Sequence, residues 1–277
     1  VDKAKEIDAD LVLGTDPDSD RVGVAVKTAT GYELLTGNQI GALLIDFILC
    51  NTDISRFSKP AVIKTEVTSE LGAEVARKYG VNIFSTLTGF KFIGEKIKQW
   101  EKDNKHTYVF GFEESCGYLR GTHARDKDAV VASMLCAEMV CYYKYVGKTV
   151  YARLQEIYAK YGFVLDKNVS IQYAGLNAMK EMNGVVDGLK TLSISQIAGV
   201  DVVAVRDYSA AKRKIVQSGE TEQMDIPKCN CVYYELAGGS FVCVRPSGTE
   251  PKLKIYYSLK AKDETSANAQ LEEVQAS

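Results

Sequence analysis

The sequence predicts an α/β protein in which a layer built on a mixed, mostly parallel sheet is followed by a smaller α+β domain. Strand-like and helix-like segments alternate along residues 37–146, which is typical of β-α-β units. Beyond Gly147 the pattern changes to strands in which apolar and polar residues alternate, as in an antiparallel sheet with one exposed face. We therefore predict a domain boundary within residues 147–165.

Hydrophobic spacing predicts the elements of the first half. The helix that begins at Gly37 carries apolar residues at the spacing of one helix face, namely Ile40, Leu43, Leu44, Phe47 and Ile48. Gly80 ends the helix Ser69–Tyr79, because glycine adopts the left-handed C-cap conformation readily. The apolar stretch Ala129–Tyr143 is shorter than the roughly 20 residues of a membrane span, so we expect a buried helix. The other predicted elements are the strands Asp10–Leu13, Val22–Val26, Ala61–Lys64, Val81–Thr86 and Thr107–Phe110 and the helix Phe90–Lys102.

The elements of the second half are shorter. In Leu253–Leu259 apolar residues alternate with polar ones, which indicates a half-exposed antiparallel strand. The polar segment Lys212–Lys228 predicts a long surface loop. The remaining predicted elements are helices at Leu154–Tyr161 and near Leu176–Met182, and strands from Val164 and at Val200–Val205 and Phe241–Arg245.

Composition excludes several classes of partner. The 34 basic and 36 acidic residues give a net charge of −2, so no overall field attracts nucleic acid or an anionic membrane. Two histidines leave little room for a multi-histidine metal centre. The seven cysteines lack a zinc or disulfide framework, and residues 1–10 do not resemble a signal peptide, so we expect reduced thiols and a cytoplasmic protein.

An acidic loop follows the first predicted strand. Asp16, Asp18 and Asp20 alternate along it and would repel one another unless a cation lay among them, and oxygen ligands suit magnesium or calcium. We reject an EF-hand, because Arg21 and Lys27 occupy its required glycine and glutamate positions. A dehalogenase-type aspartate nucleophile and a solvated aspartate-rich turn remain alternatives.

Three further segments carry candidate binding groups. Thr88–Gly94 is a glycine turn that opens a helix with Lys91 in its first turn, suited to an anion or to no ligand at all. Gly111–Tyr118 offers acidic and hydroxyl groups for vicinal sugar hydroxyls, and His123, Arg125 and Lys127 follow it. Arg245–Pro251 combines a guanidinium, two hydroxyls and a glycine, as in a phosphate cradle. A plain β-hairpin turn with proline and glycine is the alternative.

In this order the four segments resemble the phosphohexomutases (phosphoglucomutase/phosphomannomutase), in the branch whose metal loop reads Asp-Pro-Asp-x-Asp-Arg. The resemblance spans about residues 10–260. It implies three related α/β domains and a C-terminal α+β domain around one cleft. On this chain it implies a remnant of domain two with the metal loop at 1–33, domain three at 34–148, a linker helix at 149–164 and domain four at 165–277.

The resemblance also implies roles for individual residues. Asp16, Asp18 and Asp20 would hold Mg²⁺, and the catalytic cations would be Arg21 and Lys127. The residues implied to bind substrate are Thr88, Gly89, Lys91, Glu113, Ser115, Arg125, Arg245, Ser247, Gly248 and Thr249.

The implied reaction interconverts hexose 1-phosphate and hexose 6-phosphate through a phosphoserine and a hexose bisphosphate, with glucose as the expected sugar. The family's Thr-Ala-Ser-His-Asn-Pro-like serine loop is absent from this sequence. Together with Val1 as first residue, this suggests a fragment that lacks its N-terminal domains and is inactive alone. The alternatives are a phosphomannomutase or phosphopentomutase, a non-catalytic sugar-phosphate-binding module, and a dehalogenase-like phosphatase.

Overall fold

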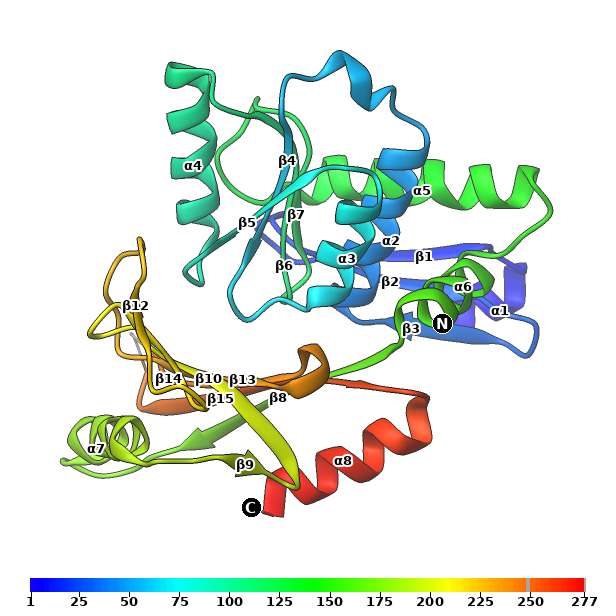
Figure 1. Cartoon of the computed structure of the whole chain (residues 1–277). Helices are drawn as coiled ribbons and strands as arrows, with labels where there is room; N and C mark the ends of the chain where they lie inside the picture. The colour runs from blue at the N-terminus through cyan, green and yellow to red at the C-terminus, as the bar shows by residue number, and fades with distance from the viewer. Residues whose placement is uncertain (248–249, 277) are drawn as a thin grey trace. The chain divides into compact units, whose positions relative to one another are not determined.

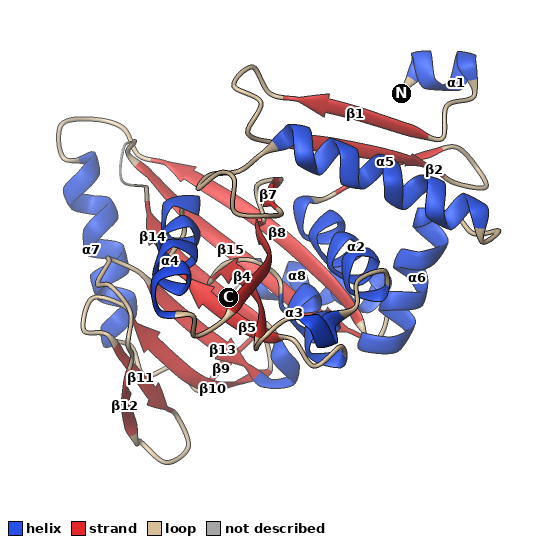
Figure 2. Cartoon of the chain, turned by 90° about the horizontal axis from the view of Figure 1, so that it is seen from above, coloured by secondary structure: helices blue, strands red, loops and turns tan. Residues whose placement is uncertain are grey.

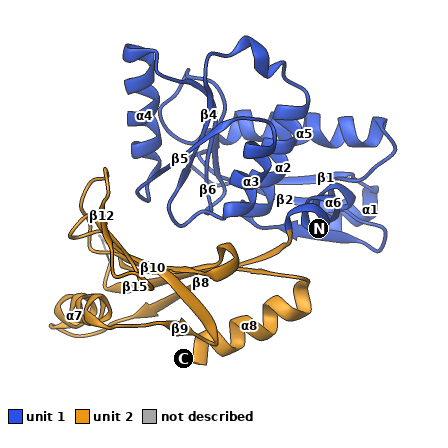
Figure 3. Cartoon of the chain, viewed as in Figure 1, with its two compact units in different colours: residues 1–161 blue, residues 162–277 orange. Residues whose placement is uncertain are grey.

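The computed structural model describes residues 1–247 and 250–276, which form two compact units, Val1–Tyr161 and Gly162–Ser277 (Figure 3). The first unit begins with α1 (Asp2–Ile7) and contains two sheets (Figure 1). An antiparallel sheet has the order β1-β2-β3, with β1 at Leu11–Thr15, β2 at Val22–Lys27 and β3 at Tyr32–Leu35.

The second sheet of this unit is mixed, as predicted. Its order is β5-β4-β6-β7, in which β4, β5 and β6 are parallel and β7 is antiparallel to β6. The strands are β4 (Pro60–Thr65), β5 (Asn82–Thr86), β6 (Thr107–Glu113) and β7 (Gly117–Leu119). The helical elements of the unit are α2 (Gly37–Cys50), η1 (Ile54–Arg56), α3 (Glu70–Lys78), α4 (Phe90–Asp103), α5 (Ala129–Tyr145) and α6 (Val150–Tyr161).

Helices cover both faces of the mixed sheet (Figure 1). On one face α4 buries Ile93, Ile97 and Trp100 against the sheet. On the other, Phe112 packs directly on α2 and α3, because a Cβ at Gly41 would lie only 2.3 Å from its ring. This close packing fixes the carboxyl ends of β4 and β6, where the candidate site lies.

The helix α5 differs from the prediction of a buried helix. One face packs on β1 and β2 (Figure 2), but Val130 and Met134 are 69% and 53% exposed. The helix carries apolar residues on all of its sides, so its sequence does not show that only one face is covered. Among the described residues no single helix is long and apolar enough to cross a membrane; α5 and α6 reach that length only together, across an 87° bend.

The helix predicted as a linker is α6, and it packs within the first unit. Arg153 on α6 forms an ion pair with the buried Asp46 of α2, with 2.8 Å between Nη2 and Oδ1. The compact units accordingly divide between residues 161 and 162.

The second unit is an antiparallel sheet with helices on one face. The strand order is β12-β11-β10-β13-β14-β15-β8, and β9 pairs with β10. Met182 and Val186 of α7 and Val274 of α8 belong to its core cluster. The elements are β8 (Phe163–Gln172), α7 (Ala178–Thr191), β9 (Gln196–Ile197), β10 (Val200–Asp207), β11 (Lys212–Ile215), β12 (Thr221–Gln223), β13 (Val232–Leu236), η2 (Ala237–Gly239), β14 (Phe241–Pro246), β15 (Lys252–Ala261) and α8 (Glu264–Ala276).

The prediction of a long loop at Lys212–Lys228 was wrong. That segment contains β11 and β12, which pair from Lys212↔Gln223 to Lys214↔Thr221. Its polar composition suits the edge of the sheet, where β12 pairs only with β11 through backbone hydrogen bonds that require no apolar side chains.

Candidate functional site

The three aspartates of the acidic loop converge. The loop connects β1 to β2, and Asp16 Oδ1 accepts hydrogen bonds from the N–H groups of Asp20 at 3.1 Å and Arg21 at 3.0 Å. Ser19 has a positive φ of 57°, so the turn is tight. One carboxylate oxygen from each of Asp16, Asp18 and Asp20 lies within 4.8 Å of the others.

This donor set fits a hard divalent cation. All three ligands are carboxylates, the type that magnesium prefers. The hydrogen bond from the backbone of Arg21 lowers the pKa of Asp16, so this group is ionised at neutral pH. Asp20 Oδ1 is buried, has no hydrogen-bond partner among the described residues and lies 3.7 Å from Arg21 Nε, so a metal cation would supply the close contact that it lacks.

Backbone contacts join the acidic loop to the turn after β6. Arg21 forms a bridge with Gly117, and the N–H of Val22 donates to the carbonyl of Cys116 at 3.2 Å. Gly117 is required here, because a Cβ would lie 2.3 Å from Cδ of Lys127 and 2.9 Å from Cγ of Glu113. Segments almost a hundred residues apart in sequence therefore form one site.

The Glu-Glu-Ser turn points two acids in different directions. Glu113 is buried, and the Ser115 hydroxyl donates to its Oε1 at 2.9 Å. Glu114 instead lies near the hydroxyls of Thr65 and Thr68, which donate to its Oε2 at 3.3 and 3.4 Å. Burial raises the pKa of Glu114, and the neighbouring Glu113 adds to this effect.

Lys127 connects the acidic loop to the cationic segment. Its Nζ lies 2.9 Å from Asp20 Oδ2 and 2.9 Å from Asp126 Oδ1. Burial opposes its charge, but the hydrogen bonds to Asp126 and Asp20 outweigh burial and raise the pKa of Lys127. This lysine is therefore a fixed positive charge next to the aspartates.

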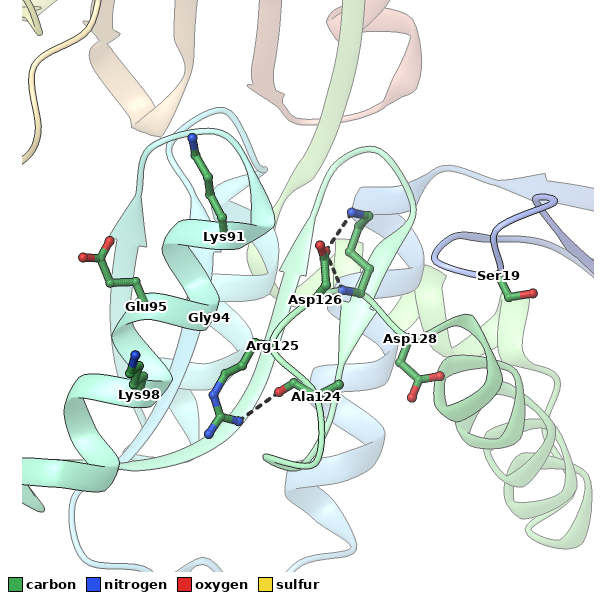
Figure 4. Close-up of a pocket in the computed structure, with 10 residues that line it drawn as sticks. Ser19, Lys91, Gly94, Glu95, Lys98, Ala124, Arg125, Asp126 and Asp128 are labelled. Atoms are coloured by element: carbon green, nitrogen blue, oxygen red, sulfur yellow. Dashed lines mark hydrogen bonds and ion pairs between the residues drawn. The ribbon is translucent and has the colours of Figure 1, made fainter.

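Arg125 is turned away from the aspartates. Its guanidinium pairs with Glu101 of α4 and donates to the carbonyls of Thr122 at 2.5 Å and Ala124 at 3.0 Å. Figure 4 shows it pointing away from Asp126 and Asp128. The guanidinium of Arg125 is therefore paired with residues of its own chain, whereas Lys127 lies beside the acidic loop.

A cavity of about 610 Å³ opens between α4 and residues 124–128 (Figure 4). Lys91 and Lys127 both line it, which brings the predicted lysines to one pocket. Thr88 and Gly89 lie just before α4, with Gly89 as its N-cap at φ 118°, and are not among the lining residues. The lining residues are Ser19, Lys91, Gly94, Glu95, Lys98, Ala124, Arg125, Asp126, Lys127 and Asp128.

The predicted phosphate segment belongs to the second unit. Arg245 lies in β14 opposite Lys254, one residue before the strand ends, and the N–H of Ser247 donates to the carbonyl of Lys252 at 2.7 Å. Gly248 and Thr249, also predicted there, lie outside the described residues.

Comparison with known proteins finds a matching family for part of the chain. Residues 36–161 match the model of "Phosphoglucomutase/phosphomannomutase, alpha/beta/alpha domain III". Phosphoglucomutase from Staphylococcus haemolyticus is 36% identical over 260 residues, which cover 94% of this chain and 46% of the relative. Residues 36–161 are thus a domain III of the phosphoglucomutase/phosphomannomutase type. It spans about half the length of the curated relatives it matches.

Solved structures of this family share the fold. The phosphoglucomutase pp63/parafusin from Paramecium has a TM-score of 0.68 at 16% identity, with 96% of this chain and 43% of that one covered. N-acetylphosphoglucosamine mutase from Aspergillus fumigatus, in complex with GlcNAc-6P and magnesium, has a TM-score of 0.50 at 15% identity, covering 95% and 51%.

Sequence reasoning did not assign a role to two acids of this candidate site. Glu114 holds the turn in place by accepting a hydrogen bond from the Thr65 hydroxyl. Asp126 holds Lys127 by accepting a hydrogen bond from its Nζ. Strand alternation was the available signal for Glu114, because adjacent residues at the end of a strand face opposite sides. Nothing in the sequence pattern singled out Asp126.

Replacing Glu114 by glutamine should change how stability depends on pH. Because the pKa of Glu114 is raised above 4.5, the folded chain binds more protons than the unfolded chain above that pH. Stability is therefore lost as pH rises through this window, by at most about 1.4 kcal/mol per pH unit for one proton. Glu114→Gln should remove this loss and be the more stable protein at neutral pH.

Urea unfolding followed by the fluorescence of Trp100, the single tryptophan, measures this difference. The exposed Glu95→Gln is the matched control and should keep the pH dependence of the unaltered chain. An identical pH slope in Glu114→Gln and the unaltered chain would show that Glu114 is not held as the neutral acid.

Proposed function

We propose that this chain is the metal-, sugar- and phosphate-binding part of a Mg²⁺-dependent phosphohexomutase that interconverts hexose 1-phosphate and hexose 6-phosphate, with glucose as the sugar. The observation that carries this proposal is the meeting of Asp20, Lys127 and Glu113 in one unit, within a family of phosphosugar mutases. The acidic loop suggests the branch with an Asp-Pro-Asp-x-Asp-Arg metal loop.

The acidic end is proposed as the phosphoryl-transfer end. Asp16, Asp18 and Asp20 would hold Mg²⁺, which when bound supplies Lewis-acid stabilisation of charge on the transferring phosphoryl group. Arg21 and Lys127 add positive charge beside the same loop, where Lys127 is fixed by Asp20 and Asp126. Positioning and charge stabilisation are the main tasks of a protein in such a transfer.

The sugar would be held by the neighbouring turn. Glu113 and Ser115 present a carboxylate and a hydroxyl to vicinal sugar hydroxyls, and Lys91 and Lys127 line the adjacent cavity. Thr88 and Gly89 are proposed to contribute at the start of α4, and Arg125 only if it leaves Glu101. In the second unit Arg245, Ser247, Gly248 and Thr249 are proposed to hold the distal phosphate.

The domain assignment belongs to the same proposal. Residues 1–33 would be the end of domain two, 34–148 domain three and 165–277 domain four. The phosphoserine and the hexose bisphosphate intermediate would involve N-terminal domains of the same protein. A cytoplasmic location agrees with the seven free cysteines.

Assaying this chain with glucose 1-phosphate, glucose 1,6-bisphosphate and Mg²⁺ tests the assignment of roles. We expect no glucose 6-phosphate, because the family's serine loop is absent from the sequence. Turnover to glucose 6-phosphate would contradict the proposal. Release of inorganic phosphate that stops in Asp16→Asn would favour a dehalogenase-like phosphatase instead.

A further inference from the structure

The second unit contains a pair of buried thiols in contact. Cys231 lies just before β13, and Cys243 lies within β14, the neighbouring strand of the sheet. Their Sγ atoms are 3.3 Å apart, and the two residues are 6% and 0% exposed. Two thiols at this separation need only a small movement to reach the 2.05 Å of a disulfide bond.

A third thiol connects this pair to solvent. Cys229 is half-buried and hydrogen-bonds through its side chain with Cys231. Arg245 and Lys190 lie near enough to act electrostatically on Cys229, and both charges favour its thiolate. The side chain of Asn230 holds the chain in place here, because it accepts a hydrogen bond from Lys190 and donates one to Asn183.

We propose that Cys229, Cys231 and Cys243 form a thiol–disulfide exchange site that reacts with low-molecular-weight disulfides and ends in a Cys231–Cys243 bond. The partly accessible Cys229 receives the small disulfide, Cys231 lies within reach of both other thiols, and Cys243 provides the buried end. This inference does not depend on the proposed mutase function.

Each step of the exchange forms one disulfide bond and breaks another. The Cys229 thiolate attacks the small disulfide, which breaks and releases one thiolate. Cys231 then attacks Cys229 Sγ and expels the second small thiolate, and Cys243 attacks Cys231 Sγ and returns Cys229 to the thiol form. Two protein thiols lose two electrons and two protons, and the small disulfide is reduced to two thiols.

The resting thiols are protected at neutral pH. The hydrogen bond with Cys231, followed by burial, raises the pKa of Cys229, so that little thiolate is present. The rate of exchange should therefore rise with pH, as more thiolate forms. Because Arg245 follows Cys243 by two residues, the new bond would lie beside the segment proposed to bind phosphate.

Oxidised glutathione is the probe for this site. After incubation of the full chain, free thiols are alkylated and the protein is digested with trypsin, which leaves all three cysteines in one peptide, residues 229–252. We expect this peptide to lose two hydrogens, carry one alkyl group and hold no glutathione. Cleavage of the peptide bond after Glu235 should leave the two halves of this peptide linked, because Cys231 lies before Glu235 and Cys243 lies after it.

Variants separate the three roles. Cys229→Ser should form the same bond at least about tenfold more slowly, because the accessible thiol is lost. Cys243→Ser should stop at the Cys229–Cys231 bond, which does not link the two halves of the peptide. The exposed Cys141→Ser is the control and should react as the unaltered chain does. Glutathione retained on Cys229 of the unaltered chain, or reaction only at the exposed Cys50 and Cys141, would overturn the proposal.

Discussion

Replacing Asp46 by alanine should lower the free energy of unfolding of the first unit by about 3–5 kcal/mol, the range for breaking a buried ion pair. The Asp46 side chain is 3% exposed and receives Nε and Nη2 of Arg153, each at 2.8 Å. It also accepts the hydroxyls of Tyr79 at 3.1 Å and Tyr143 at 3.0 Å. Alanine would leave these donors from three helical regions without their acceptor.

Trp100 fluorescence during urea unfolding measures this loss, because the single tryptophan reports on the first unit. Asp53→Ala is the matched control: Asp53 also pairs with an arginine, Arg56, but on the surface, so its loss should leave the midpoint unchanged. Equal midpoints for Asp46→Ala and Asp53→Ala would show that the Asp46 network does not stabilise the unit.

Replacing Asp20 by asparagine should weaken Mg²⁺ binding by at least about tenfold, because affinity depends on the number of charged oxygen ligands. Asp20 contributes to the three-carboxylate cluster, and its buried Oδ1 has no hydrogen-bond partner among the described residues. Its removal leaves two of the three carboxylates. We expect the unaltered chain itself to bind weakly, because the cluster offers three carboxylates whereas Mg²⁺ takes octahedral coordination.

Calorimetric titration with Mg²⁺ measures this difference. Asp126→Asn is the control, since Asp126 also contacts Lys127 but lies outside the three-aspartate cluster. It should keep the affinity of the unaltered chain within a few-fold. Sub-micromolar binding by the unaltered chain, or equal affinities for Asp20→Asn and Asp126→Asn, would contradict the assigned ligand set.

The α/β layer could be predicted because its signals are local. Apolar runs such as Ala61–Lys64 and the amphipathic Phe90–Lys102 correspond to β4 and α4. The strands β11 and β7 are short or polar, so their pairing with the neighbouring strands β10 and β6, rather than their own composition, determines them. Which face of α5 is covered is likewise decided by tertiary contacts rather than by its sequence.

The candidate site was partly predictable for the same reason. The spacing of Asp16, Asp18 and Asp20 makes them neighbours within one loop, so their convergence follows from the sequence. The bridge from Arg21 to Gly117 and the pairing of Arg125 with Glu101 depend on tertiary packing. The resemblance assigned Lys127 to catalysis and Arg125 to substrate binding, and of these two only Lys127 lies against an aspartate of the loop.

Calorimetric titration of glucose 6-phosphate into this chain with Mg²⁺ present tests the central claim most directly. We predict saturable binding that Glu113→Gln weakens by about tenfold or more, because one carboxylate contact to sugar hydroxyls is lost. Glu33→Gln, a change at an exposed glutamate of β3, should bind as the unaltered chain does. No binding by the unaltered chain, or equal binding by both variants, would contradict a sugar-phosphate site at Glu113 and Lys127.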